Sequence, residues 1–249
     1  MAYTTIDKPS DYFTTKLFTG NGGTNAITGV GFQPDWIWFK NRTSAQSHAI
    51  VDSVRERKGL QSNTTEAEYT LASGKDFGTF DSDGFTVLTP EQLNSFNYNT
   101  GSIVAWNWKA GTSFTNDASS TSIGSIDSAG SVSDISGFSI VSFTGTGSNG
   151  TIKHGLSTAP NLFIIKRLDA DNDWRVGSSA LTNFVKHVNL NTEAAQSDLA
   201  SAFNSTGPTT SVFSVGTSVS TNASGGTYIA YCFSSIKGYS KVGSYTGNG

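Results

Sequence analysis

The sequence contains three histidines, whose imidazole groups could bind a metal or transfer a proton: His48, His154 and His187. Each lies in a different stretch of the chain, without a second histidine or a cysteine at the spacing of a zinc motif. His154, in the stretch GTIKHGL, precedes a predicted turn, which is typical of a structural residue at a strand end. The sequence therefore predicts no zinc site.

Acidic residues occur at alternate positions in DADND (169–173), as they do in calcium-binding loops. The turn glycine and the distal glutamate of an EF-hand are missing, which favours a solvated loop. Asp81 and Asp83 in FDSDGF are explained by turn chemistry. No serine lies in a G-x-S-x-G elbow. We predict no catalytic residue, no metal ligand and no cofactor, and the ligand-binding residues stay undefined. Carboxylates from distant loops could still meet for glycoside cleavage.

The composition narrows the function classes. The chain has 249 residues, of which 14% are charged, and a formal net charge of −3. Without a Lys/Arg run, an electrostatic grip on nucleic acid or anionic membranes is disfavoured. The single cysteine, Cys232, lies in the apolar run YIAYCF and is expected to be a buried thiol. No signal peptide and no apolar run long enough to span a membrane is recognised, so we expect synthesis in a cytoplasm without export by a cleaved signal.

The sequence repeats itself, and the repeat defines the elements that must position any site. The order YFTTKLFTGNG, GFQPDWIWFKNR, SHAIVDS and SIVAWNWKAG returns as GFSIVSFTGTG, GLSTAPNLFIIKR, DWRVGSS and TYIAYCFSS. Matching landmarks are 125 or 126 positions apart: Phe18 and Phe143, Pro34 and Pro160, Lys40 and Lys166, His48 and Trp174, and Trp106 and Tyr231.

The repeat predicts a division of the chain into four segments. Residues 1–109 and 137–234 form two repeated domains, joined by a Ser/Gly-rich linker or weak hairpin at 110–136. Residues 235–249 end in SYTGNG and restate the opening of the unit, so they are predicted to begin a truncated third repeat. We expect a strand at 239–245 that pairs with an exposed sheet edge.

Each repeat reads as about six short strands with no helical period. In WIWFKNR, Trp36, Trp38 and Lys40 share one parity and Ile37 and Phe39 the other, which predicts a strand buried on both sides. Asp83-Gly84 between apolar residues predicts a β-hairpin. The predicted fold class is all-β, with two tandem antiparallel β-sandwich domains of jelly-roll or lectin-like type.

The five tryptophans could stack on sugar rings: Trp36, Trp38, Trp106, Trp108 and Trp174. Their repeat counterparts are Leu162, Ile164, Tyr231, Phe233 and His48. Because four of these five counterparts are large and apolar, the tryptophans are predicted to lie in the core. Polar positions differ between the repeats, since Asp35 answers Asn161 and Asp52 answers Ser178. This pattern argues against a duplicated active site.

The phrases DSVRERKGLQSNTTEAE, FDSDGFTV, VAWNWKAG and GYSKVGSYTGNG, together with the repeated ones, resemble a repeat family of tail-fibre-like and other virion proteins of marine bacteriophages, notably those of cyanobacteria. The resemblance covers nearly the whole chain. It implies a non-enzymatic virion structural protein, either a tail fibre or an external decoration on the particle. It also implies contact with other virion proteins and a homo-oligomer, with a trimer as the favoured state.

Two other functions stay open at this point. The first is a host-attachment module that recognises surface polysaccharide through exposed loops. The second, a polysaccharide depolymerase, has less support because the repeats share no acid or base. Neither nucleic acid nor membrane insertion is expected, and the protein is expected in the virion.

Overall fold

The computed structural model describes residues 4–248, and β-strands dominate it. The α-helices within this range have four residues each: α1 (Ala118–Thr121), α2 (Ala200–Phe203) and α3 (Val219–Asn222). A single 3-10 turn, η1 (Pro9–Asp11), precedes the first strand. The neighbouring strands in every sheet pair antiparallel, so the predicted all-β, antiparallel fold class is confirmed. No helix in the described part of the chain has the length and apolarity needed to cross a membrane.

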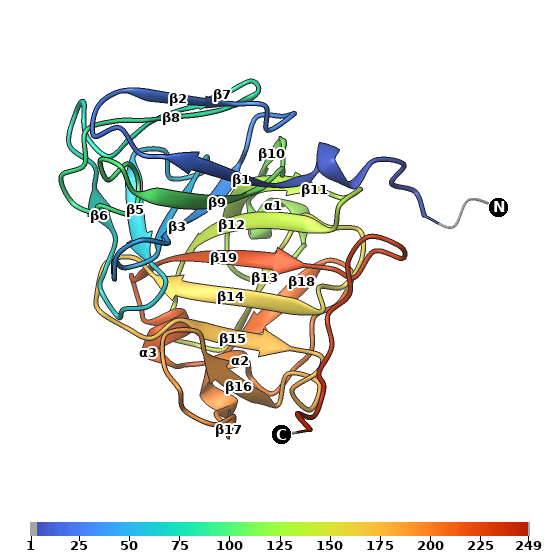
Figure 1. The fold of residues 1–249 in the computed structure, drawn as a ribbon. Helices are drawn as coiled ribbons and strands as arrows, with labels where there is room; N and C mark the ends of the chain where they lie inside the picture. The colour runs from blue at the N-terminus through green and yellow to red at the C-terminus, as the bar shows by residue number, and fades with distance from the viewer. Residues whose placement is uncertain (1–3, 249) are drawn as a thin grey trace. The chain divides into compact units, whose positions relative to one another are not determined.

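The chain separates into two compact units, which are described individually (Figure 1). The N-terminal unit comprises Lys8–Gly111. The C-terminal unit comprises Thr112–Gly249 together with Met1–Asp7.

The N-terminal unit consists of two antiparallel sheets. The larger sheet has the order β1 (Phe13–Thr19), β9 (Ser102–Trp108), β3 (Trp36–Asn41), β4 (Ala49–Asp52), β5 (Lys58–Gln61) and β6 (Tyr69–Thr70). The smaller sheet has the order β2 (Asn25–Thr28), β8 (Gly84–Val87) and β7 (Phe77–Asp81). Asp81 pairs with Gly84 across a tight turn, which confirms the hairpin predicted from Asp-Gly.

The core of the N-terminal unit lies between its two sheets. Ile37 and Phe39 of β3 enter it from the larger sheet, and Ile27 of β2 and Phe85 of β8 enter it from the smaller one. The ring of Phe39 meets that of Phe85 edge to face, with centroids 5.3 Å apart. Since strand residues alternate between faces, the neighbours of Ile37 and Phe39 in sequence point to the opposite side of the sheet.

The C-terminal unit has a similar construction, with two additional strands in its larger sheet and one strand fewer in its smaller sheet. Its larger sheet has the order β10 (Thr112–Asn116), β11 (Ser128–Ser133), β12 (Phe138–Thr144), β19 (Thr227–Phe233), β14 (Leu162–Arg167), β15 (Arg175–Ser178), β16 (Lys186–Asn189) and β17 (Ser197–Asp198). Its smaller sheet pairs β13 (Gly150–Lys153) with β18 (Val212–Val215). The core between these sheets contains Phe163, Phe213 and Cys232, so the predicted burial of the cysteine is confirmed.

Apart from β7, β10 and β11, each strand of one unit has a counterpart in the other. The series β1-β9-β3-β4-β5-β6 matches β12-β19-β14-β15-β16-β17, and the pair β2-β8 matches β13-β18. Strands far apart in the sequence therefore adopt the same neighbours in each unit. The sequence repeat corresponds to a repeated sheet topology.

A buried asparagine fixes the turn after β1 and the equivalent turn after β12. In the N-terminal unit, the backbone nitrogen of Asn21 donates to Asn97 Oδ1 at 3.0 Å, and Asn97 Nδ2 donates to the carbonyl of Gly23. In the C-terminal unit, Thr146 N donates to Asn222 Oδ1 at 2.8 Å, and Asn222 Nδ2 donates to the carbonyl of Ser148. Neither asparagine side chain is exposed to solvent.

The glycine that opens each turn allows this close approach. A Cβ atom on Gly20 would lie 2.1 Å from the carbonyl oxygen of Tyr98, and one on Gly145 would lie 2.3 Å from that of Ala223. Any larger residue would push the asparagine loop away from the turn. The repeated sequence T-G-x-G therefore specifies a turn that packs closely against the segment carrying the buried asparagine.

The polar residue before β3 and its counterpart before β14 accept equivalent hydrogen bonds in the two units. Asp35 Oδ2 accepts a hydrogen bond from Ala110 N at 2.8 Å, and Asn161 Oδ1 accepts one from Ser235 N at 2.8 Å. The inference that polar positions are not kept between the repeats is therefore wrong for this pair. The letter changes between Asp35 and Asn161, but both side chains offer the same acceptor oxygen.

The segment 110–136, predicted as a linker or a weak hairpin, forms a hairpin that belongs to the larger sheet of the C-terminal unit. β10 and β11 pair with each other, and β11 pairs with β12 along the edge of the larger sheet. Phe114 and Val132 from this hairpin pack against the core of the C-terminal unit. Small residues conceal the strand pattern because Ser and Gly carry little of the apolar alternation on which a strand prediction depends.

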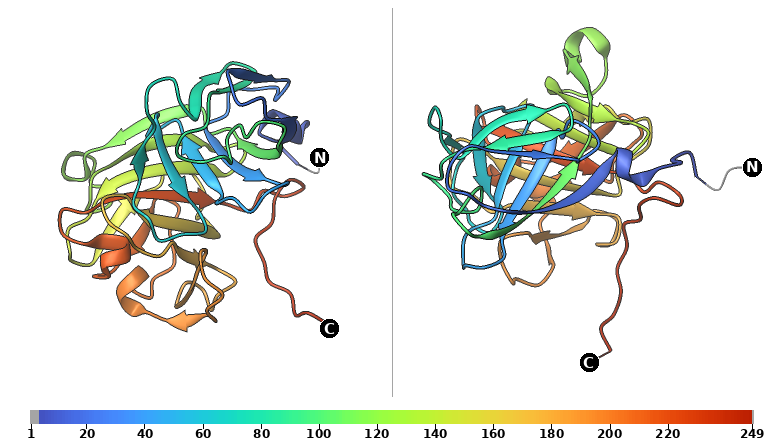
Figure 2. Two further views of the ribbon diagram at one scale, coloured as in Figure 1. Left: turned by 60° about the vertical axis from the view of Figure 1, so that its left-hand side comes forward. Right: turned by 45° about the horizontal axis from the view of Figure 1, so that its top comes forward.

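The strand predicted at 239–245 does not form. Ile236 and Ser240 exchange backbone hydrogen bonds of 3.0 and 2.9 Å in a turn, and residues 241–248 join no sheet. Figure 2 shows this stretch, in dark red, leaving the rest of its unit as coil. The side chain of Tyr245 is 95% exposed. Residues 1–3 of the first predicted domain and Gly249 of the last segment lie outside the described residues.

Candidate functional site

An aromatic face covers part of the larger sheet of the N-terminal unit. Because Ile37 and Phe39 point into the core, Trp36 and Trp38 point to the other face of β3. The register places Trp38 beside Trp106 and Trp36 beside Trp108 on the adjacent strand β9. The antiparallel pairing alone therefore gathers four tryptophans on one face.

The aromatic rings on this face contact one another at varied angles. The centroids of Trp38 and Trp106 are 6.3 Å apart, with the ring planes at 72°. Those of Trp36 and Trp108 are 4.4 Å apart at 40°, and Phe13 of β1 lies 4.8 Å from Trp108 at 51°. None of these pairs is stacked face to face.

A hollow on this face is open to solvent and has a volume of about 470 Å³. We call it the aromatic hollow, and six residues line it: Phe13, Trp38, Lys40, His48, Trp106 and Trp108. The volume is within the range of small-ligand sites, about 300–1,000 Å³. Its walls are almost entirely apolar, and its polar groups come from the lysine and the histidine.

The predicted burial of all five tryptophans is only partly right. Trp36 and Trp174 are 1% and 0% exposed. Trp38, Trp106 and Trp108 are half-buried and lie outside the core cluster of their unit. The alternation in WIWFKNR places Trp38 on the opposite face from Ile37 and Phe39, but it does not say which face packs against the second sheet. The comparison of the repeats leads to the wrong burial because it treats every large apolar position as part of the core.

Lys40 is the only cation in the aromatic hollow. Its Nζ atom donates a hydrogen bond of 2.8 Å to the carbonyl of Gln46. Across residues 4–248, no carboxylate lies within ion-pair distance of this ammonium group. Burial and the charge of Lys40 lower the pKa of His48, so this imidazole is neutral at pH 7.

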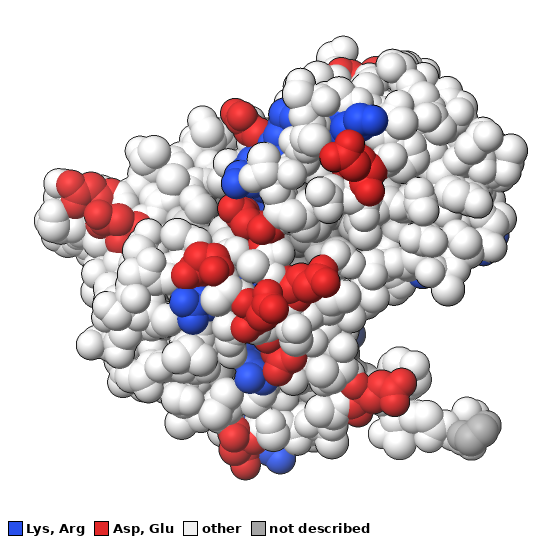
Figure 3. Space-filling view, turned by 90° about the vertical axis from the view of Figure 1, so that its left-hand side faces the viewer, with Lys and Arg blue, Asp and Glu red and all other residues white. Residues whose placement is uncertain are grey.

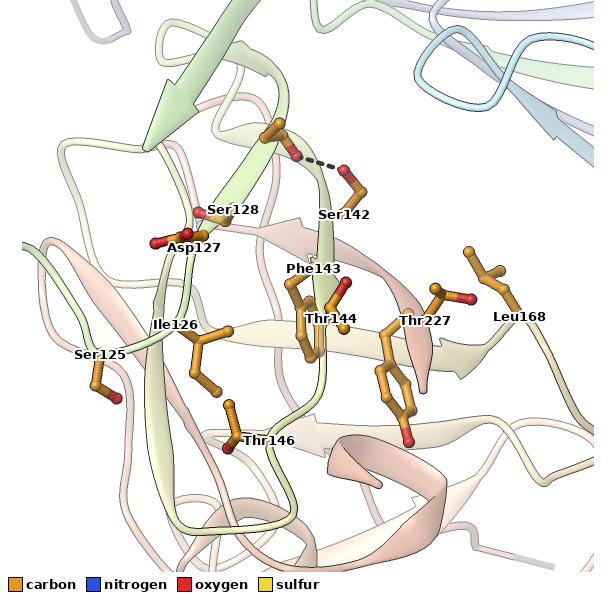
Figure 4. Close-up of a pocket in the computed structure, with 12 residues that line it drawn as sticks. Ser125, Ile126, Asp127, Ser128, Ser142, Phe143, Thr144, Thr146, Leu168 and Thr227 are labelled. Carbon is orange, nitrogen blue, oxygen red and sulfur yellow. Dashed lines mark hydrogen bonds between the residues drawn. The ribbon is translucent and has the colours of Figure 1, made fainter. Parts of the chain in front are cut away.

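A second hollow of about 620 Å³ lies in the C-terminal unit and is lined mainly by hydroxyl groups (Figure 4). Its aromatic residues, Phe143 and Tyr228, stack with centroids 5.2 Å apart but are buried. The Tyr228 hydroxyl accepts from Ala223 N and donates to the Val219 carbonyl, and Ser142 donates to the Ala129 carbonyl. We call this hollow the hydroxyl groove.

Residues 8–249 match the model of a family described as a domain of unknown function (DUF7483). The chain belongs to this family. No curated protein and no solved structure matches the chain. The DUF7483 match extends over both units, so the family domain comprises the whole repeated pair.

The three histidines of this DUF7483 chain lie apart and in different contexts. His154 is fully buried, accepts a hydrogen bond from Leu156 N through Nδ1, and contacts the Thr209 carbonyl through Nε2 at 3.1 Å. Since Nδ1 is an acceptor, Nε2 carries the proton and donates it to that carbonyl. His154 thus fastens the chain after β13 to the loop before β18, as expected of a structural residue.

His187 resembles the base of a hydrolase only superficially. Ser197 Oγ lies 3.5 Å from His187 Nε2, but Arg175 Nη1 donates to the same nitrogen at 3.0 Å. The guanidinium therefore occupies the lone pair that a general base would need. Burial and the charge of Arg175 lower the pKa of His187.

The acidic residues of DADND bind protein groups. Asp169 accepts from Arg167 Nε at 3.0 Å and from Thr227 N at 3.1 Å. The Arg167 hydrogen bond holds the pKa of Asp169 at about 2. Asp173 accepts from the side-chain amide of Asn191 at 2.9 Å. Among residues 4–248, no group of three or more histidine, cysteine or acidic side chains could hold a metal ion.

Proposed function

We propose that the protein is a structural component displayed on the surface of a bacteriophage particle, as a tail fibre or an external decoration. One observation carries the proposal: the repeated features are structural ones. The two units share sheet order, a buried asparagine and the Asp35/Asn161 acceptor. Repetition of packing and turns is expected of an assembly protein, in which each domain contributes shape and contacts.

The character of the surface supports display in a crowded, salt-containing medium. On the face shown in Figure 3, acidic and basic side chains form small separate groups surrounded by uncharged residues. With only 14% charged residues in the chain, contacts to neighbouring virion proteins would depend on shape and hydrogen bonds more than on charge. We propose a homo-oligomer, with a trimer as the favoured state.

The test is detection of the protein in particles of the phage whose genome encodes it. Particles purified by density gradient should contain the protein at a fixed stoichiometry by quantitative mass spectrometry. Gold-labelled antibodies against it should mark intact particles, at the tail for a fibre or at the shell for a decoration. Presence in infected-cell lysate with none on purified particles would refute the proposal. Native mass spectrometry of the recombinant protein tests the trimer separately.

A further inference from the structure

We propose that the aromatic hollow of the N-terminal unit binds a pyranose ring that carries a negative charge, as found in acidic surface polysaccharides. The inference goes beyond display on a particle, because it assigns a ligand class to six named residues. It rests on the aromatic lining, the single unpaired ammonium group and the difference between the two units.

The aromatic lining fits the shape of a sugar ring. A pyranose has flat faces of C–H bonds and a polar edge of hydroxyl groups. The Trp38 and Trp106 rings stand at 72° to each other, so one ring can stack on a sugar face while the other flanks its edge. Both side chains are only partly buried, so part of each ring surface remains accessible to a ligand.

Lys40 supplies the charge preference. Its ammonium group lies in the lining, contacts one backbone carbonyl and has no acidic partner in the described chain. A carboxylate or sulfate on the sugar would complete the pairing at a site where the apolar walls limit screening by water. An uncharged acyl chain would cover this cation without compensating it, and desolvating an unpaired charge is unfavourable.

The repeat shows that the residue types at two of the six lining positions, Trp38 and His48, are not needed for the fold. The C-terminal unit builds the same sheet with Ile164 at the position of Trp38 and with Trp174 at the position of His48. The substitution Trp38→Ile therefore replaces the ring with a side chain that the repeat itself tolerates. It removes the stacking surface while keeping a β-branched residue that suits a strand.

The experiment uses the full chain on an array that carries uronate-containing, sialylated, sulfated and neutral oligosaccharides. The affinity for the tightest acidic glycan and for its uncharged parent is then measured by titration of tryptophan fluorescence. We expect wild type to prefer the acidic glycan. Trp38→Ile should weaken binding of both by at least tenfold, and Lys40→Gln should weaken binding of the acidic glycan alone by about fivefold or more. Tyr98→Ala, which alters an exposed aromatic residue outside the hollow, should bind as wild type does.

Circular dichroism and thermal melting of each variant establish that it is folded before its affinity is compared. Binding of no acidic glycan on the array by wild type would overturn the proposal. So would unchanged affinity in Trp38→Ile, or binding of dodecanoate with no saccharide, which would assign the hollow to acyl chains. These results leave the display function to its own test, because the virion assay does not depend on ligand binding.

Discussion

Asn97 and Asn222 make the same buried contacts 125 positions apart (222 − 97). Each side-chain oxygen accepts a hydrogen bond from the backbone nitrogen that follows the first glycine of the turn. The donor is Asn21 N in one unit, at 3.0 Å, and Thr146 N in the other, at 2.8 Å. The backbone carbonyl of each asparagine accepts a second hydrogen bond from the next residue of the turn. The donor is Gly22 N, at 3.1 Å from Asn97 O, or Gly147 N, at 2.9 Å from Asn222 O. Each asparagine thereby fastens its own segment to the turn after β1 or after β12.

Removing either asparagine should destabilise its unit. Asn97→Ala and Asn222→Ala each leave several buried backbone groups without partners, so we expect a loss of about 2 to 4 kcal/mol in the free energy of unfolding. Urea titration followed by circular dichroism measures this loss. Asn99→Ala, an exposed position in the same loop as Asn97, should change stability by less than about 0.5 kcal/mol. Equal effects of Asn97→Ala and Asn99→Ala would contradict the role assigned to the buried side chain.

Replacing Asp35, before β3, with the asparagine found at the matching position of the C-terminal unit should have little effect on stability. Asp35→Asn installs the residue that the C-terminal unit uses, and its amide oxygen can still accept from Ala110 N, so we expect a cost below about 1 kcal/mol. Asp35→Ala removes the acceptor from a site that is 6% exposed and should cost about 2 kcal/mol. Denaturant unfolding of both variants gives the comparison. If Asp35→Asn were as damaging as Asp35→Ala, the negative charge and not the acceptor oxygen would be what the fold requires.

Much of the fold could be predicted from the sequence because the strongest signals are local. Alternation in WIWFKNR and the Asp83-Gly84 turn specify a strand and a hairpin without reference to the rest of the chain. The repeat then carries these elements from one unit to the other. The sequence leaves 110–136 open between a linker and a weak hairpin, because the hairpin β10–β11 is completed by its pairing with β12, a contact that a Ser- and Gly-rich sequence does not reveal.

The candidate site was predictable only in part. The sequence marks only three of the six residues of the aromatic hollow, Trp38, Trp106 and Trp108, as possible sugar-stacking groups, and the burial inferred for them is wrong. It gives no such indication for Phe13, Lys40 and His48. Whether a large apolar residue faces the core or the other side of a sheet depends on which side the second sheet packs. The strand predicted at 239–245 is absent for a similar nonlocal reason. SYTGNG repeats the sequence at the end of a strand, but a strand forms only when a neighbouring strand pairs with its backbone groups.

Acid should destabilise the fold through His154. Burial lowers the pKa of this imidazole to about 4, whereas the unfolded chain keeps a value near 6.5. The unfolded state therefore takes up its proton first, so stability is complete above about pH 6.5 and falls as the pH drops toward 4. The loss across this window is about 3 kcal/mol.

Urea unfolding of wild type and His154→Gln at several pH values between 7 and 4 measures the His154 contribution. At pH 7 the variant should be less stable than wild type. Between pH 6.5 and 4 its free energy of unfolding should fall by about 3 kcal/mol less than that of wild type. His48 and His187, whose pKa values are also lowered, keep part of the pH dependence in both proteins. Parallel curves for the two proteins would show that His154 is not the titrating group.

Cys232 should be unreactive until the C-terminal unit unfolds. Its thiol is fully buried on β19 opposite Phe163, and burial raises its pKa to about 12, so at pH 8 only about one molecule in ten thousand carries the reactive thiolate. We expect no labelling by an aromatic disulfide reagent such as DTNB over an hour in native buffer, and one thiol per chain in 6 M guanidinium chloride. Glutathione serves as the control for reagent activity. Native labelling at a rate near that of glutathione would mean that β19 opens readily and that the core around Cys232 is less stable than its packing indicates.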